Sequence, residues 1–138
     1  MLQRNKSLLK PQKALLDSSA IIALLKKEAG YKIIEDVIAT SSMSSVNFSE
    51  VISVLARSNV TDSDINEIIA DLIPEIIPFT QDISILAGKL ITVTNIYGLS
   101  LGDRACIATG IIHNFKILTT DKAWQECQIP NADIVLIR

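Results

Sequence analysis

Four acidic residues lie at, or within one helical turn of, places where the sequence predicts a strand to end or a helix to begin: Asp17, Glu50, Asp103 and Asp121. The carboxyl ends of parallel strands share one edge of a sheet, where open α/β folds bind their ligands. Four carboxylates gathered there repel one another, which raises their pKa values and destabilises the site. Mg²⁺ and Mn²⁺ prefer oxygen ligands of this kind. The pattern therefore predicts a site for a hard divalent cation.

A cation held by carboxylates is suited to phosphoryl chemistry. It lowers the pKa of bound water, orients the phosphate and stabilises charge on the attacking and leaving oxygens, and two such ions about 3.5–4 Å apart clamp an in-line displacement. No other catalytic pattern competes, because the chain has no GxxxxGK[ST], GxGxxG or GxSxG sequence. His113 is the only histidine, and its place near the end of a predicted helix favours a contact with the helix dipole over catalysis.

Helix capping is the alternative explanation for each acid taken alone. The segments Asn47–Glu50 and Ser100–Asp103 both have the spacing between an N-cap residue and the third residue of a helix. Their acids could therefore simply complement a helix amino terminus. Asp17 and Asp121 could be caps themselves.

The combination of acids favours a site over a set of caps. Asp17 follows the first predicted strand and Asp121 follows the fourth, so both belong to the same edge of a parallel sheet. Asp64 and Asp82 serve as controls, since they occupy similar first-turn positions and we assign them no chemistry. We predict that the first four carboxylates face a common pocket and that Asp64 and Asp82 lie outside it.

Strands and helices alternate along the chain, which predicts a parallel sheet with right-handed crossovers and helices on both faces. The segment 75–79 is nearly all apolar, as is typical of a central strand. Apolar runs and turn residues place the strands at 14–16, within 40–45, and at 75–79, 116–120 and 132–137. Helical periodicity and cap residues place the helices at 20–28, 31–39, 47–59, 61–72, 80–97 and 100–114, with a short turn at 121–125.

Composition limits the class of protein. At 138 residues the chain is long enough for one domain with its own core. Hydrophobic residues make up 49% and aromatic residues 4%, so the core must be aliphatic. No apolar run reaches the roughly 18 residues of a membrane span, and the start of the chain has no apolar segment typical of a secretory signal. We expect a cytoplasmic protein with no membrane partner. The net charge of −2 does not by itself indicate a nucleic-acid-binding protein.

Residues 1–13 are basic and precede the first acid. A frayed, solvated terminus is the simpler interpretation of this extension, and an arm that contacts phosphate is the other. Cys106 and Cys127 lack CxxC spacing and the sequence has only one histidine, which argues against a zinc site. We expect both to be buried free thiols.

Four segments together resemble the PIN-domain ribonucleases, in particular the VapC-type toxins of type II toxin–antitoxin pairs. They are Leu15–Ala20, Asn47–Val51, Leu99–Cys106 and Leu118–Trp124, in the family's order and spacing. The resemblance extends from about Ala14 to the carboxy terminus. It implies a single PIN-like domain at 14–138, with a three-layer α/β fold and a five-stranded parallel sheet of order 3-2-1-4-5.

The resemblance also implies a metal-dependent endoribonuclease that hydrolyses RNA phosphodiester bonds with Mg²⁺ or Mn²⁺. Carried over by motif, the four acids become the metal-binding and catalytic carboxylates. Asp17 and Asp103 are expected to hold a metal directly, and Glu50 and Asp121 to act partly through water.

Four further side chains receive roles from the resemblance. Ser19 and Thr119 would orient the carboxylates, with a turn-stabilising hydroxyl as the alternative for Ser19. Arg104 and Lys122 each follow an acid and would contact RNA or neutralise the acidic cluster. A solvated surface position is the alternative for both.

Partners and competing functions complete the prediction. Family analogy implies a cognate antitoxin whose tail blocks the acidic pocket, and a homodimer to which the Ile-rich helices at 31–39 and 61–72 supply apolar surface. The alternative function is a non-catalytic PIN-like module that binds RNA or protein. A phosphotransfer receiver domain also gathers acids at strand ends, but it needs paired acids after the first strand, and this strand ends in Asp17-Ser18-Ser19.

Overall fold

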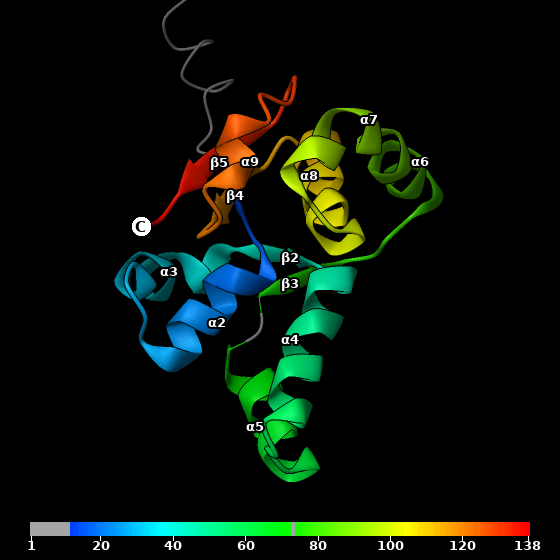
Figure 1. Cartoon of the computed structure of the whole chain (residues 1–138). Coiled ribbons are helices and arrows are strands. Elements are labelled where there is room, and N and C mark those ends of the chain that lie inside the picture. The colour runs from blue at the N-terminus through cyan, green and yellow to red at the C-terminus, as the bar shows by residue number, and fades with distance from the viewer. Residues whose placement is uncertain (1–11, 73) are drawn as a thin grey trace, which may run out of the picture.

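The computed structural model describes residues 12–72 and 74–138. Most of the predicted basic extension therefore lies outside the described residues. Figure 1 shows the arrangement of the elements. The strands are β1 (Ala14–Leu16), β2 (Ser42–Ser44), β3 (Glu75–Ile77), β4 (Lys116–Thr119) and β5 (Asp133–Leu136). The helices are α2 (Ser18–Lys26), α3 (Tyr31–Val37), η1 (Ile38–Thr40), α4 (Ser45–Arg57), α5 (Asp62–Leu72), α6 (Gln81–Lys89), α7 (Ile91–Thr94), η2 (Asn95–Tyr97), α8 (Leu101–His113) and α9 (Ala123–Glu126).

The five strands form one parallel sheet in the order β3-β2-β1-β4-β5, which confirms the predicted topology. Strand β1 is central, with Leu15 opposite both Ser42 and Ile117. Strand β3 is at the edge, although its apolar residues are typical of a central strand. Exposed Glu75 at its start pairs with Lys13 at 3.3 Å, and such a charge suits an edge.

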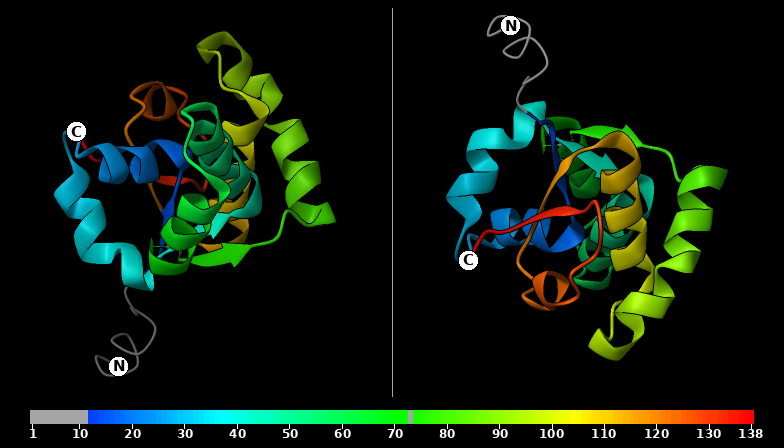
Figure 2. Two further views of the ribbon diagram at one scale, coloured as in Figure 1. Left: turned by 90° about the horizontal axis from the view of Figure 1, so that it is seen from below. Right: turned by 90° about the horizontal axis from the view of Figure 1, so that it is seen from above.

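Alternate residues of the central strands face two separate apolar cores. Leu15 and Ile117 pack on one face with residues of α6, α8 and α9. Leu16 and Leu118 pack on the other face with residues of α2, α3 and α4. Figure 2 shows these helices on the two sides of the strands. The two-residue period of a strand thus produces the predicted three layers, and burial of both faces explains the aliphatic composition.

The first turn of α4 differs from the prediction. The helix begins at Ser45 and its N-cap is Ser44, whose hydroxyl accepts a hydrogen bond from the Val46 amide at 3.2 Å. The prediction that Asn47 opens the helix is wrong, because β2 leads directly into α4 and the serine at the junction supplies the cap. Asn47 and Glu50 are therefore the third and sixth residues of α4. Glu50 cannot complete a capping box there.

The predicted helix at 80–97 is interrupted after Lys89 and continues as the short α7 and η2. The boundary lies at Leu90, before the β-branched residues of α7, Ile91 to Thr94, which have a lower helix propensity. No helix of the described residues is long and apolar enough to cross a membrane. Both cysteines are free and buried, as predicted.

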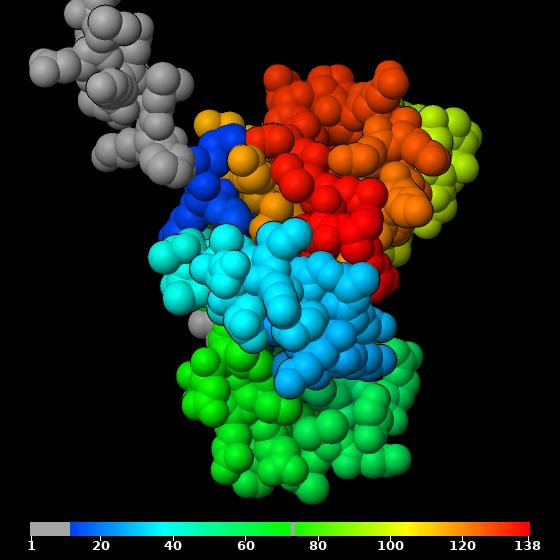
Figure 3. Space-filling view, turned by 90° about the vertical axis from the view of Figure 1, so that its left-hand side faces the viewer, coloured from blue at the N-terminus to red at the C-terminus, as the bar shows by residue number. Residues whose placement is uncertain are grey.

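The end of the chain packs beside α2 and α3, as Figure 3 shows. Arg138 lies 3.9 Å from Glu28, and the Ile137 carbonyl oxygen occupies the space that a Cβ on Gly30 would need. Gly30 also has φ +90, so only glycine fits this turn without strain. Helices α4 and α5 form an antiparallel pair that extends away from the strands (Figure 1).

Candidate functional site

Asp17 is the most buried of the four predicted acids, with 3% of its surface exposed. It follows β1 directly and caps α2, where its Oδ1 accepts hydrogen bonds from the Ala20 amide at 2.9 Å and the Ser19 hydroxyl at 2.7 Å. The Thr119 hydroxyl donates to its other oxygen at 2.7 Å. Burial raises the pKa of Asp17 to about 6, while these hydrogen bonds lower it and Asp103 raises it further. The environment therefore penalises the free carboxylate.

Thr119 connects Asp17 to Asp121. Its hydroxyl oxygen accepts a hydrogen bond from the Asp121 amide at 3.1 Å while its proton goes to Asp17. The Asp121 side chain is exposed and accepts a hydrogen bond from the Ala123 amide at 3.0 Å. Thr119 and Ser19, both predicted to orient the carboxylates, each donate to Asp17. Their contribution to a metal site stays a proposal.

Asp103 lies in the first turn of α8 and completes a capping box. It accepts a hydrogen bond from the Ser100 amide at 2.9 Å, and its own amide donates to the Ser100 hydroxyl at 3.2 Å. Partial burial raises its pKa, against the lowering effect of the Ser100 bonds, and the charges of Glu50 and Asp121 raise it further. Asp103 therefore makes a cap and also lies within electrostatic reach of two other acids.

Glu50 is held by groups from three other places in the chain. Its Oε1 accepts a hydrogen bond from the Asn47 amide at 2.7 Å and one from the Ser18 hydroxyl at 3.2 Å. Its carboxylate also packs against Gly102, where a Cβ would come within 2.7 Å of the carboxylate carbon. Glu50 thus spans the gap between α2, α4 and the start of α8.

The charges of the four acids act on one another through Asp103, while their convergence on a common pocket stays a prediction. Asp103 is coupled to Asp17, Glu50 and Asp121, as the causes of the raised pKa values show. The buried thiol of Cys106 lies beneath them, since burial raises its pKa well above 9.0 and the charges of Asp17, Asp103 and Glu50 add to that effect. The control acids behave differently: neither Asp64 nor Asp82 contributes to these shifts.

In the described structure the four acids are not arranged as a complete set of metal ligands. Within residues 12–72 and 74–138, no three His, Cys, Asp or Glu side chains are placed so that they could hold a metal ion. The capping box turns one candidate ligand, the Asp103 carboxylate, back toward Ser100. The chemistry of the donors nevertheless suits Mg²⁺ or Mn²⁺, because a buried carboxylate with a raised pKa gains from a nearby hard cation.

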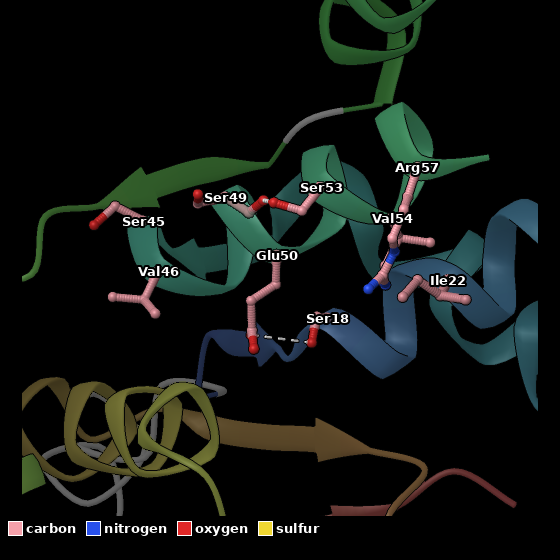
Figure 4. A pocket seen from close by; sticks show the side chains of 9 residues that line it. All are labelled: Ser18, Ile22, Ser45, Val46, Ser49, Glu50, Ser53, Val54 and Arg57. Atoms are coloured by element: carbon pink, nitrogen blue, oxygen red, sulfur yellow. Dashed lines mark hydrogen bonds between the residues drawn. The ribbon is translucent and has the colours of Figure 1, made fainter. Parts of the chain in front are cut away.

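A groove of about 600 Å³ opens beside Glu50. Figure 4 shows Glu50 and Arg57 reaching into it from α4, with Ser18 on α2 opposite. Three more serine hydroxyls line its wall, from Ser45, Ser49 and Ser53. Within the described residues Arg57 forms no ion pair. The groove therefore places hydroxyl groups and one positive charge next to Glu50.

The predicted RNA contacts of Arg104 and Lys122 stay predictions. The Arg104 guanidinium donates from Nη1 to the Ala87 carbonyl at 2.9 Å and so links α8 to α6. An RNA contact would have to use the nitrogens that this bond leaves free. Lys122 is exposed beside Asp121. Trp124 is buried at 1% exposure and packs in the core.

Sequence reasoning missed three residues around Glu50. Asn47 and Arg57 are three and seven residues from Glu50 on one helix, so the helical period could have placed them on its face. They were missed because the start of α4 was predicted two residues too late. The close approach of Gly102 has no local signal in the sequence, since it depends on how α4 packs against α8.

Comparisons with known proteins agree with this fold. No curated protein matches the chain. The solved structures it resembles include a toxin-antitoxin complex from Klebsiella pneumoniae, with 22% identity, 91% of this chain and 98% of that chain covered and a TM-score of 0.69. Another is a DNA-bound VapBC from Salmonella typhimurium, with 15% identity, 92% and 99% coverage and a TM-score of 0.73. A third is VapBC2 from Rickettsia felis bound to a promoter DNA fragment, with 20% identity, 89% and 97% coverage and a TM-score of 0.68.

At these identities the structural likeness shows the fold alone. The family model described as "PIN domain" matches residues 14–129, which include all four acids. Together with the sheet order and the mutually coupled carboxylates, this match shows that the chain belongs to the PIN domain family.

Proposed function

We propose that this protein is a Mg²⁺- or Mn²⁺-dependent endoribonuclease and the toxin component of a toxin–antitoxin pair. The observation on which the proposal rests is the cluster of Asp17, Glu50, Asp103 and Asp121 at the carboxyl edge of the sheet, where burial and mutual repulsion raise the pKa of two of them. A domain does not gain stability from this repulsion. A cation that the acids share would remove it.

The acids have separate roles in this proposal. Asp17 and Asp103 hold the cation directly, which requires Asp103 to leave its capping box, and Glu50 and Asp121 bind it partly through water. When bound, the cation supplies an activated water and stabilises charge on the phosphate oxygens. Ser19 and Thr119 keep the Asp17 carboxylate in one orientation by donating to its two oxygens.

The groove beside Glu50 supports a nucleic-acid substrate. Arg57 offers a charged donor for a phosphate, and the serine hydroxyls can bind phosphate or ribose oxygens. This arrangement places a bound backbone next to the acids without a deep pocket for a free base. An RNA substrate would place the proposed activity in the cytoplasm.

The test is cleavage of RNA by the purified chain with Mg²⁺, with Mn²⁺ or with a chelator. We expect cleavage only with metal, products that end in a 5′-phosphate, and no detectable cleavage by the Asp17→Asn protein. Equal cleavage in the chelator, or full activity of Asp17→Asn, would refute the proposal.

A non-catalytic binding module is the second candidate. The observation that favours it is the capping box of Asp103, which gives this acid a structural role without metal. If the module only binds RNA, Mn²⁺ should leave the melting temperature unchanged. If the acids share a cation, saturation at 100 times the dissociation constant should stabilise the fold by about 2.7 kcal/mol.

The antitoxin proposal rests on an apolar hollow next to the groove. The hollow has about 240 Å³ and shares Ile22 and Val54 with the groove, and Leu25, Leu55 and Ile68 line it as well. A tail with apolar residues followed by a basic residue would fill the hollow and reach the acids. We expect a peptide of this kind to inhibit RNA cleavage and the Val54→Asp variant to resist inhibition.

We place the homodimer on a different face from the one first predicted. Of the helices at 31–39 and 61–72, the described residues expose only one large apolar side chain, Ile33. More of them lie on the segment from α6 to α8: Ile85, Ile91, Val93, Ile96, Leu101 and Ile112, with Ile96 85% exposed. Such exposure is typical of an interface. Sedimentation of the wild type and of Ile96→Asp checks this assignment.

A further inference from the structure

Asn47 is buried at 1% exposure between α4 and α8, and its amide nitrogen has two acceptors. It donates to Oε1 of Glu50 at 2.7 Å and to the Gly102 carbonyl at 3.1 Å. One bond stays within α4, and the other reaches the second residue of α8, next to Asp103. A single amide therefore connects the two helices that supply two of the acids.

The orientation of the Asn47 amide follows from these partners. Both are oxygen acceptors, so the nitrogen and not the oxygen must face them. The Oδ1 atom is then left buried without a hydrogen-bond partner in the described structure. An unsatisfied buried acceptor destabilises the folded state. An apolar residue would avoid that cost, so a role in stability alone explains asparagine poorly.

Gly102 makes the second contact that fixes Glu50. A Cβ there would come within 2.7 Å of the Glu50 carboxylate carbon and within 2.8 Å of Oε1, closer than side-chain atoms pack. Any residue other than glycine would displace the carboxylate. Gly88, the penultimate residue of α6, has open space around the same position and shows that not every helix glycine among the described residues is sterically required.

We infer that Asn47 and Gly102 are positioning residues that hold the Glu50 carboxylate beside Asp103, ready for the cation that the acids share. The inference rests on the proposed function, because it assigns these residues to the same metal site. Asn47 fixes the carboxylate by donation, and Gly102 leaves the space into which it fits. Neither residue touches the cation or the substrate in this assignment.

The test is Mn²⁺ binding measured by calorimetry without RNA, for the wild type, Asn47→Ala and Gly102→Ala. Loss of a group that orients a metal ligand costs roughly 10–100-fold in affinity. We expect a loss in that range for both variants, with RNA cleavage shifted to higher Mn²⁺ concentration. The matched controls are Asn66→Ala, on the exposed face of α5, and Gly88→Ala, and both should bind Mn²⁺ as the wild type does.

A double-mutant cycle separates positioning from general structural damage. If Asn47 acts through Glu50, Asn47→Ala should weaken Mn²⁺ binding in the wild type but not in the Glu50→Gln background. An equal loss in both backgrounds would overturn the inference, and so would wild-type affinity in both Asn47→Ala and Gly102→Ala. If Asn47→Ala fails to fold, Gly102→Ala decides the question, because alanine is favourable in a helix.

The outcomes also distinguish this inference from the proposed function. A wild type that binds Mn²⁺ but cuts no RNA refutes the nuclease, while the double-mutant cycle still decides the role of Asn47. A wild type that cuts RNA and an Asn47→Ala variant with unchanged Mn²⁺ binding refute the inference alone. A wild type that binds no Mn²⁺ refutes both.

Discussion

Glu50 lies in the second turn of α4 and Asp103 in the first turn of α8, and the two carboxylates are held by different means. Asp103 is bound to its own helix start, through the Ser100 amide and hydroxyl. Glu50 accepts hydrogen bonds from side chains of α2 and α4, and its carboxylate fits into the space beside Gly102 on α8. The contacts of Asp103 are local in the sequence, and two of those of Glu50 are long-range.

This difference indicates which of the two carboxylates is already positioned to bind a cation. Glu50 keeps its position as long as α2, α4 and α8 stay packed, so it is preorganised. Asp103 can rotate out of its cap without disturbing any other element, because the Ser100 hydroxyl still caps α8. We expect a cation to move Asp103 and to leave Glu50 where it is.

The largest expected effect concerns activity. Glu50→Gln and Asp103→Asn should each lower RNA cleavage by more than the roughly 100-fold that loss of an outer partner of a metal ligand costs. Asp64→Asn and Asp82→Asn are the controls, since both acids lie in first turns outside the cluster. If the Asp103→Asn variant cut RNA at the wild-type rate, Asp103 would be a helix cap only. It could then no longer be compared with Glu50 as a second metal-binding carboxylate.

The next effect is the pH dependence of stability without metal. The pKa of Asp17 is about 6 in the folded chain and 3.8 ordinarily, so the folded state binds this proton more tightly and the free energy of unfolding falls as the pH rises from about 4 to 6. Asp17→Asn removes this ionisation. We expect it to stabilise the protein by about 2 kcal/mol at pH 7.5, after allowance for weaker hydrogen bonds, and by almost nothing at pH 4.

Urea unfolding at several pH values measures this difference. The same measurement shows how Asp17 compares with Glu50 and Asp103, because it reports the cost of burying the Asp17 carboxylate without metal. A constant difference between Asp17→Asn and the wild type from pH 4 to 7.5 would show that burial of Asp17 does not destabilise the empty site.

The smallest effect concerns the caps. Ser100→Ala should lower the free energy of unfolding by about 1 kcal/mol, because its hydroxyl bonds the Asp103 amide. Thr80→Ala, which removes the corresponding bond to Ile83 at the start of α6, is the matched control and should cost a similar amount. Thermal unfolding measures both. A much larger cost for Ser100→Ala would mean that the Asp103 region is not the purely local structure described above.

The sequence predicted the fold better than it predicted the fine geometry of the site. Alternating apolar strands and amphipathic helices predicted a parallel sheet covered on both faces, because the burial of both faces is encoded in the strands, and the family resemblance supplied the strand order. The same four-residue spacing at Asn47–Glu50 and Ser100–Asp103 left capping open as the alternative for both acids, and only Asp103 makes a capping box. At α4 the N-cap is Ser44, three residues before Asn47, so the segment Asn47–Glu50 lies inside the helix and Glu50 cannot cap it.

The remaining errors have the same physical origin. The position of Gly102 against Glu50 and of Arg104 against Ala87 depends on how helices far apart in the sequence pack together. Local patterns do not contain that information. The placement of β3 at the edge is also a property of the whole sheet, because its composition alone is typical of a central strand.

The hydrogen bond between Thr119 and Asp17 joins residues 102 positions apart in the chain. During synthesis the amino-terminal half of the site, with Asp17 and Glu50, emerges long before β4 can add its strand beside β1. A contact of such sequence separation forms late in folding. The acidic site is therefore completed only after β4 and Asp121 have left the ribosome. For the proposed nuclease, the nascent chain would be harmless to the RNA around it until then.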